Sequence, residues 1–257
     1  MLEIVKRIRM KRATDAAVGD VQVFLERLLV EVVAGNYRHF LNERIELSKD
    51  GDLDSIYQCW PPLFANERQV SGIFASALNT MSPSTVPEHK IRRRLEREED
   101  EELKGTAGRV DFLSTFGRRT IGLELKGAAV STTAGGDYTV LKTLWDRVVD
   151  QSKEAHTFMR QPELRADYPE GTGIGLMVVR VARHISGKYT LDSEANLQAE
   201  SIDRVVQEIQ RKLKPDFMAK YLPPIEMQTV QKEKGYRIFS CIVFAAVVHG
   251  KAESLRG

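Results

Sequence analysis

Two segments of the chain are apolar at nearly every position, and they constrain the fold more than any other feature. They are GIGLMVVRVARH (173–184) and YRIFSCIVFAAVVHG (236–250). A strand that is apolar on both faces is typical of the centre of a sheet that is covered on both sides. We therefore expect an α/β fold, in which a mixed β-sheet lies between helices on both faces.

The rest of the chain alternates between helical and extended patterns. Residues 88–105 are dense in both charges, and we interpret them as a strand followed by a loop. Two alternating apolar and polar segments, 109–116 and 119–127, flank Gly117 and Arg118 and predict a hairpin. The segment GTGIG (171–175) is interpreted as the entry to a strand. Helices are expected over residues 66–79, 139–160 and 195–213.

Breaks in the pattern divide the chain into two regions. Residues 1–60 are interpreted as a mainly helical N-terminal extension, with Asp20 as the cap of its helix. The opening residues, MLEIVKRIRMKR, fit an arm that contacts phosphates, an exposed edge strand or a helix. The KDGDLD turn (49–54) and WPP (60–62) then separate the extension from a domain over residues 61–257.

Composition excludes several classes of protein. The 38 Lys and Arg residues nearly balance the 36 Asp and Glu residues, which excludes a polybasic nucleic-acid-binding tail. Cys59 and Cys241 are the only cysteines and lie far apart, which excludes a zinc ribbon and a disulfide framework. The longest apolar run, 242–248, is too short to span a bilayer, and the first residues lack the apolar core of a secretory signal. We therefore expect a cytoplasmic protein without a membrane span.

Ionisable residues interrupt the apolar pattern of the predicted hairpin. Glu124 and Lys126 are two residues apart and should share one face of a strand. Asp111 lies on the neighbouring strand, and Val110 and Phe112 are expected to point together away from it. Two close carboxylates repel each other unless a cation lies between them, and Mg²⁺ binds carboxylates while it keeps several waters. A metal-bound water beside Lys126 supplies what hydrolysis of a phosphodiester requires.

Two further polar residues fall on the expected buried faces of helices. Glu67 lies one turn before Val70, and Gln151 continues a row that contains Leu144 and Val148. A buried carboxylate or amide needs a partner, which a metal site on the sheet would supply. Two plainer interpretations stay open, namely a first-turn glutamate that the helix dipole stabilises and an amide on the flank of a helix.

The segment GRVDFLSTFGRRTIGLELKG (108–127) resembles the core of the PD-(D/E)XK nuclease superfamily, which has the restriction-endonuclease-like fold. Asp111, Glu124 and Lys126 match the motif of that superfamily. The residue before Asp111 is Val110, where the family pattern has proline. The resemblance covers roughly residues 66–185.

Helix residues extend the same resemblance. Glu67 in NERQVSGIF matches a glutamate that often precedes the hairpin, and Gln151 in WDRVVDQSKEA matches a glutamine that often follows it. The resemblance implies that Asp111, Glu124 and Glu67 bind a metal. It also implies that Lys126 assists the attacking water and that Gln151 orients the site.

The resemblance implies a Mg²⁺-dependent deoxyribonuclease, most often an endonuclease, in which Mn²⁺ can replace Mg²⁺. DNA is the implied partner, and RNA is less common. Many such nucleases pair to cut two strands, so a homodimer is consistent with the resemblance. A role in restriction, phage defence or mobile-element biology follows only by analogy.

Two other interpretations remain open at this point. The chain could be a non-catalytic module of the same fold that binds nucleic acid or a partner protein. It could also be an interaction protein in which residues 1–60 dimerise. In that case Asp111, Glu124 and Lys126 would form a cross-strand ion pair, which contributes only ~0.2–1 kcal/mol.

Overall fold

The computed structural model describes most of the chain. The described residues are 1–8, 16–49, 61–65, 67–93, 106–132, 138–185, 195–224, 229–232 and 235–250. The elements in chain order are β1 (Leu2–Lys6), α1 (Ala16–Lys49), η2 (Pro62–Phe64), α2 (Glu67–Met81), β2 (Thr85–Arg93), β3 (Thr106–Phe116), β4 (Arg119–Ser131), α3 (Thr139–Met159), η3 (Pro162–Leu164), β5 (Thr172–Ile185), α4 (Ala195–Leu213), β6 (Phe217–Tyr221), β7 (Thr229–Lys232) and β8 (Gly235–His249).

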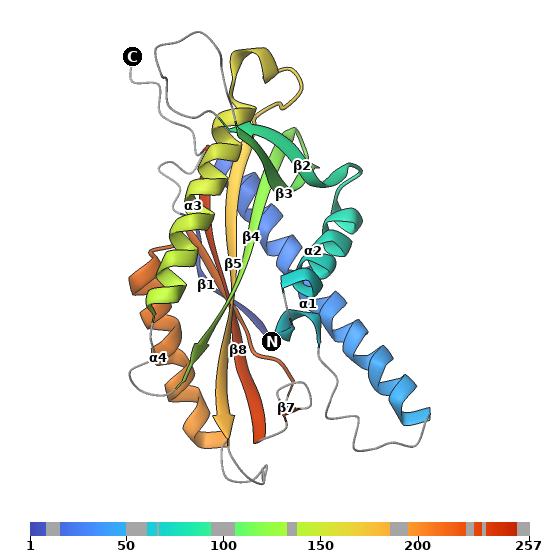
Figure 1. The fold of residues 1–257 in the computed structure, drawn as a ribbon, viewed down its shortest axis with the longest axis vertical. Helices are drawn as coiled ribbons and strands as arrows, with labels where there is room; N and C mark the ends of the chain where they lie inside the picture. Colours follow the sequence, from blue (N-terminus) through green and yellow to red (C-terminus); the bar gives the residue numbers. More distant parts are fainter. Residues whose placement is uncertain are drawn as a thin grey trace.

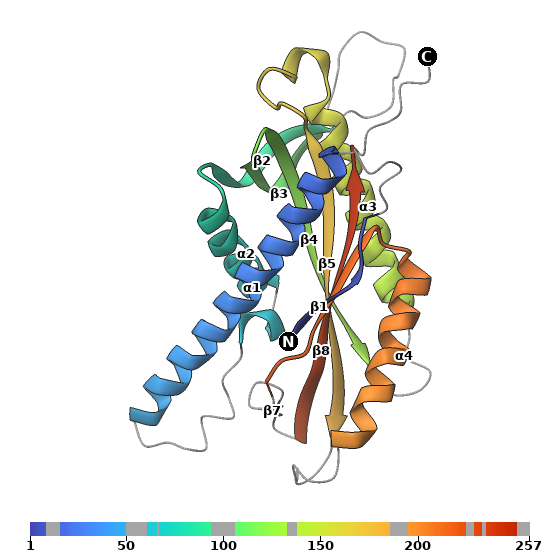
Figure 2. The same ribbon diagram turned by 180° about the vertical axis from the view of Figure 1, so that it is seen from behind.

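A single mixed sheet forms the centre of the described structure. Its strands follow the order β1-β6-β8-β5-β4-β3-β2, and β7 pairs with β8 beside this path. The β4–β5 pair is parallel and the other pairs are antiparallel. Helices α1 and α2 lie on one face of the sheet, and α3 and α4 lie on the other (Figure 1; Figure 2). The predicted α/β architecture, with helices on both faces of a mixed sheet, is confirmed.

The two strands that are apolar on both faces are β5 and β8, and they are adjacent in the sheet. Alternate residues of β5 belong to different cores: Leu176 and Val178 face α1 and α2, whereas Met177 and Val179 face α3 and α4. This position explains why no polar face is visible in either segment.

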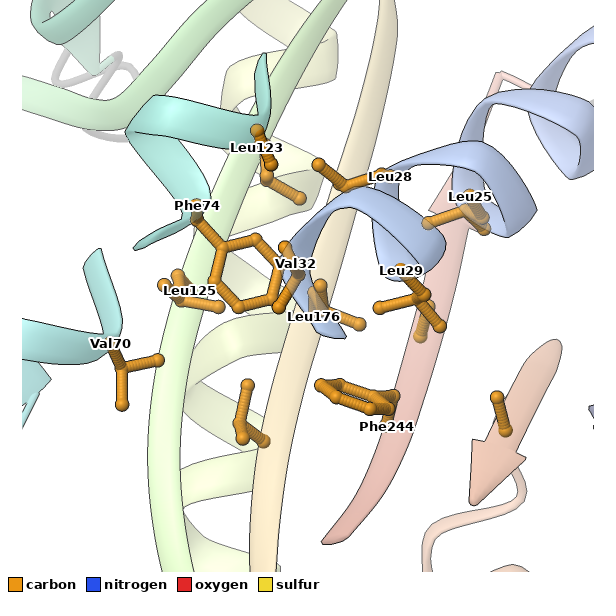
Figure 3. Close-up of a cluster of buried hydrophobic side chains, with 14 of the residues drawn as sticks. Leu25, Leu28, Leu29, Val32, Val70, Phe74, Leu123, Leu125, Leu176 and Phe244 are labelled. Atoms are coloured by element: carbon orange, nitrogen blue, oxygen red, sulfur yellow. The ribbon is translucent and has the colours of Figure 1, made fainter. Parts of the chain in front are cut away.

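The larger core lies between the sheet and the helices α1 and α2. Phe74 of α2 and Leu28 of α1 are fully buried there. Figure 3 shows the side chains of the two helices against those of the sheet, with Leu25, Leu28, Leu29, Val32, Val70 and Phe74 on one side and Leu123, Leu125, Leu176 and Phe244 on the other.

The N-terminal segment differs in two respects from its predicted form. Helix α1 begins at Ala16, so Asp20 lies inside the helix and is not its cap. The acidic side chain instead lies 3.7 Å from Arg119. Among the described opening residues the structure has a strand over Leu2–Lys6, and this strand β1 pairs with β6 at one end of the sheet. The described part of residues 1–60 thus shares its sheet and core with the rest of the chain.

The predicted hairpin is confirmed as β3 and β4. A two-residue turn of Gly117 and Arg118 joins Phe116 to Arg119. Gly117 has φ +60°, as the first central residue of a type II′ turn requires, and glycine adopts this conformation without steric cost.

No helix in the part of the chain that the structure describes is long and apolar enough to cross a bilayer.

Candidate active site

Strands β3 and β4 pair only next to their turn. Their ladder runs from the pair Phe116 and Arg119 to the pair Phe112 and Leu123. Beyond this point β3 pairs with β2, and β4 continues along β5 as far as Ser131. We call the point just beyond Phe112 and Leu123 the strand fork. Asp111 and Glu124 are the next residues on the two separating strands.

A side chain bridges the strand fork where the backbone ladder stops. The Leu125 backbone N–H donates a hydrogen bond to Asp111 Oδ2 over 2.7 Å. Leu125 lies between Glu124 and Lys126, so this contact brings Asp111 to the segment that carries the other two motif residues. A short hydrogen bond from an N–H group to a carboxylate is stronger than one between neutral groups. It therefore fixes the Asp111 carboxyl group at the fork.

The pleat of β3 is irregular at Asp111, and one prediction is wrong here. Phe112 packs in the core under α1 and α2, whereas Val110 packs against Ala155 of α3. The two neighbours of Asp111 therefore lie on opposite faces, although simple alternation predicts one shared face. The adjacent strand β2 is also irregular at this level, where Glu88 has φ +47°. Local twisting at the fork explains the change of face.

Glu124 lies under helix α3 and is 1% exposed. Its neighbours Leu123 and Leu125 both belong to the core under α1 and α2, so Glu124 alternates to the α3 face. In the parallel ladder Glu124 pairs with Gly175 of β5. A carboxylate at this depth requires a charged or hydrogen-bonding environment, because its desolvation is costly.

Two glycines of β5 let α3 approach the sheet beside Glu124. A Cβ atom at Gly175 would lie 2.8 Å from Ser152 Oγ and 2.8 Å from the Val148 carbonyl oxygen. At Gly173 a Cβ atom would lie 2.1 Å from the Ser152 carbonyl oxygen. Only glycine fits these positions, so the helix backbone forms the wall of the site.

Lys126 is half-buried and follows Glu124 on the same face of β4. In the β4–β5 ladder it pairs with Met177, whose side chain belongs to the core under α3 and α4. An ammonium group on this side of the sheet is well placed to balance negative charge that is brought to the fork.

Gln151 lies on the flank of α3 that faces the fork. Phe158 is two helical turns further along α3 and packs against the cluster that contains Val110. The side chain of Gln151 is half-buried, and its Oε1 atom is buried without a hydrogen-bond donor among the described residues. A buried amide oxygen without a donor is costly, which makes Gln151 a candidate to bind a ligand or a water.

Glu67 is the first residue of α2, and its side chain lies outside the described part of the structure. Helix α2 packs through Val70 and Phe74 against the face of the sheet opposite to α3. The metal-binding role expected for Glu67 thus stays a prediction.

The donor set at the fork consists of two described carboxylates, Asp111 and Glu124. No group of three or more His, Cys, Asp or Glu residues that could hold a metal occurs among the described residues. Two carboxylates are a donor set that fits Mg²⁺, because this ion is bound by one or two carboxylates and fills its remaining positions with water and substrate phosphate.

Gly173 and Gly175 were not among the predicted site residues. The sequence does indicate their role, because glycines at alternate positions of a strand leave two positions without side chains on one face, where another backbone can approach closely. The pattern of the GTGIG segment predicts only the entry to a strand. The hydrogen bond between Leu125 and Asp111 could not be predicted from the sequence, because every residue type except proline carries the same backbone N–H donor.

We compared the chain with protein-family models, curated proteins and solved structures, and none of the three gave a match.

Proposed function

We propose that this chain is a Mg²⁺-dependent nuclease of the restriction-endonuclease-like type and that it hydrolyses phosphodiester bonds in DNA. The observation that carries the proposal is the hydrogen bond between Asp111 and Leu125, the residue that separates Glu124 from Lys126. This contact joins Asp111 to the segment that carries the other two motif residues, at the point where the two strands separate.

Asp111 and Glu124 would hold the metal ion in this proposal. When bound, Mg²⁺ lowers the pKa of its water and neutralises charge on the phosphate oxygens. The hydrogen bond at Asp111 Oδ2 restricts the rotation of that carboxyl group. Burial restricts the movement of the Glu124 side chain. Both carboxylates are thus preorganised, so little entropy is lost when a ligand binds.

Lys126 would orient the attacking water and stabilise the negative charge that develops on the phosphate. The amide of Gln151 would accept a hydrogen bond from a water through Oε1, the atom that lacks a donor among the described residues. Helix α3 covers the buried side of the site, because Gly173 and Gly175 allow its backbone to contact the sheet. The substrate would therefore approach from the side on which Asp111 and Lys126 are partly exposed.

A plasmid-nicking assay tests this function. Supercoiled DNA is incubated with the protein in Mg²⁺, Mn²⁺ or EDTA, and an RNA substrate is assayed in parallel. We expect nicking of DNA in Mg²⁺ or Mn²⁺ and none in EDTA. Lys126→Ala should lower the rate about 100-fold or more, in the range lost when an acid–base group is removed. Asp111→Asn and Glu124→Gln should abolish the metal-dependent cleavage.

Exposed residues of α3 provide matched controls. Asp146→Asn, Glu154→Gln and Lys142→Ala make the same chemical changes on the surface and should leave the rate unchanged. Nicking that persists in EDTA, or that survives all three motif substitutions, would refute the proposal. Cleavage of RNA without cleavage of DNA would support the proposed site and would show that its substrate is RNA.

A further inference from the structure

Beyond the strand fork, one edge of β4 has no partner strand among the described residues. The β3–β4 ladder ends at Leu123, whereas the β4–β5 ladder continues to Ser131. Figure 1 shows β4 running on beside β5 after it leaves β3. We call the side of β4 that faces away from β5, from Gly127 to Ala129, the β4 edge. An edge of this kind presents backbone N–H and C=O groups to whatever approaches it.

Two hydrogen bonds fix which backbone groups point toward the β4 edge. The Thr132 N–H donates to the Ala182 carbonyl oxygen of β5 over 3.2 Å, so the even-numbered residues of this segment point toward β5. The Leu125 N–H points the other way and donates to the Asp111 carboxylate. Backbone groups alternate in direction along a strand, so the Gly127 N–H points away from β5 as well. It is the next donor along the edge after one that already binds an anionic oxygen.

A positive charge lies beside Gly127 on the α2 face of the sheet. The side chain of Arg180 on β5 donates hydrogen bonds to the carbonyl oxygens of Phe64, Ala65 and Ala128. Phe64 and Ala65 come just before α2, and Ala128 belongs to β4. These bonds hold the guanidinium group against β4, and a Cβ atom at Gly127 would lie 3.9 Å from Arg180 Nη2.

The missing side chain of Gly127 leaves space for a ligand beside this charge. Apart from the chain neighbours of Gly127, Arg180 is the only described residue with an atom within 4 Å of that Cβ position. Gly127 is half-buried and Ala129 is exposed, so the β4 edge reaches the surface. A backbone N–H and a guanidinium group beside one space are the donors that bind an anion.

We propose that the Gly127 N–H and the Arg180 guanidinium group bind the phosphate next to the scissile one in a nucleic-acid strand. The inference rests on the proposed nuclease function, which places the scissile phosphate at the strand fork. Leu125 and Gly127 are two residues apart, so their N–H groups lie about 6.7 Å from each other along β4. Neighbouring phosphates of one nucleic-acid strand have a similar spacing. The substrate backbone would therefore follow the β4 edge away from the hairpin turn.

Charge favours a phosphate over the other ligand that a strand edge can bind, which is a peptide strand. Lys126 and Arg180 lie on opposite faces of the sheet, so positive side chains flank the β4 edge on both faces. Gly127 has no side chain to pack against a paired strand, but it suits the close approach of a ligand. Binding of a peptide at this edge is therefore treated as an outcome of the test.

Steady-state cleavage of a single-stranded DNA oligonucleotide tests the proposal. Arg180→Gln removes the charge. Gly127→Ala fills the space beside Nη2 with a methyl group at an ordinary contact distance, so this variant should fold. Each should raise KM about tenfold, the effect of one hydrogen bond to a charged group. Each should leave kcat nearly unchanged, because the second phosphate is bound equally in the ground state and the transition state. Arg160→Gln and Gly72→Ala are controls at exposed positions and should match the wild type.

A second substrate separates phosphate binding from a structural role of Arg180. It is the same oligonucleotide with uncharged methylphosphonate linkages at every position except one, so its single cleavable phosphodiester has no charged neighbour. Both variants should cleave it with the kinetics of the wild type, because no second phosphate is present to bind. A variant that merely disturbs the fold would lose activity on both substrates by the same factor.

The outcomes distinguish this inference from the proposed function. Unchanged KM values in both variants, or equal losses on the two substrates, would overturn the inference and leave the nuclease function standing. If the wild type cleaves no nucleic acid, the affinity for the uncleaved oligonucleotide, measured by fluorescence anisotropy, decides. An affinity about tenfold lower in both variants would support the phosphate site without catalysis. An affinity that neither variant changes would overturn the inference and leave a peptide strand as the ligand of this edge.

Discussion

Asp111 has two physical roles, and the structure allows them to be separated. Its carboxylate accepts the Leu125 N–H where the β3–β4 ladder ends, so it replaces a backbone acceptor at the strand fork. The same carboxylate is a ligand in the proposed metal site. A substitution that removes the hydrogen-bond acceptor at position 111 should therefore lower stability. A substitution that keeps an acceptor there but removes the charge should weaken only metal binding.

Replacing Asp111 with asparagine or alanine separates these roles. Alanine leaves the Leu125 N–H without its acceptor, so Asp111→Ala should lower the free energy of unfolding by about 1–3 kcal/mol. Asp111→Asn keeps a carbonyl oxygen and should unfold close to the wild type, while it still abolishes metal-dependent cleavage. Urea denaturation measures both variants. Equal stability of Asp111→Ala and the wild type would contradict the bridging role.

Helix α3 and strand β5 contact each other through backbone atoms. Gly173 and Gly175 remove two side chains from one face of β5, and the carbonyl oxygens of Val148 and Ser152 occupy that space. The contact sets the height of α3 above the sheet. It thus determines how far Gln151 lies from the fork.

Alanine at Gly173 should disrupt this contact. Its Cβ atom would lie 2.1 Å from the Ser152 carbonyl oxygen, and that backbone atom cannot rotate away. We expect Gly173→Ala to lower the free energy of unfolding by about 3 kcal/mol, at the upper end of the cost of overpacking. Gly72→Ala is the matched control, because Gly72 is an exposed position of α2 with open space around it.

The control should change stability in the opposite direction. Alanine stabilises a helix interior by about 0.5–1 kcal/mol relative to glycine, so Gly72→Ala should raise the melting temperature. A Gly173→Ala variant as stable as the wild type would show that α3 can shift freely on the sheet.

Most elements were predictable from the sequence because each has a strong internal period. Helices α2 and α3 begin within one residue of their expected starts at residues 66 and 139. The β3–β4 hairpin follows from its glycine turn and its alternating residues. In these segments local pattern and tertiary packing favour the same structure.

The elements that escaped prediction are short strands whose stability depends on distant partners. Strand β6 has five residues between two prolines, and it forms because Phe217 and Met218 insert on opposite faces between β1 and β8. Strand β7 has four residues and pairs only with β8. Such pairing has no local period, so a single sequence does not reveal it.

The local geometry of the candidate site residues was predictable only in part. Strand alternation predicted that Glu124 and Lys126 share a face of β4, and the buried neighbours of Glu124 agree with this. Strand alternation predicted the wrong face of β3 for Val110, because the strands separate there and β3 changes its twist. Irregular backbone is a property of the assembled sheet, which explains why the sequence pattern does not record it.

At the scale of the whole molecule, the sheet joins two cores that meet different helices. A group of titratable residues lies at one end of the core under α3. Burial lowers the pKa of His249 below 6.5, and the nearby His156 and Lys153 lower it further. Asp216 and a hydrogen bond to the Val149 backbone act in the opposite direction. His249 Nε2 is buried without a hydrogen-bond partner among the described residues.

This arrangement predicts that stability declines in mild acid. The unfolded chain binds a proton at position 249 more readily than the folded chain, because the folded pKa is the lower one. The contribution of His249 is therefore fully present above pH 6.5 and is lost as the pH falls through the lowered folded pKa. His249→Gln should show a weaker fall in melting temperature below pH 6.5. Parallel pH profiles for the variant and the wild type would contradict the assignment.

The central claim is that a divalent cation binds between Asp111 and Glu124 at the strand fork. The most direct measurement is anomalous diffraction from a crystal of the protein soaked in Mn²⁺, with a crystal of Asp111→Asn as the control. The account predicts a Mn²⁺ peak in contact with both carboxylates in the wild type and its loss in the variant. A wild-type fork without a peak, or a peak that persists unchanged in Asp111→Asn, would contradict it.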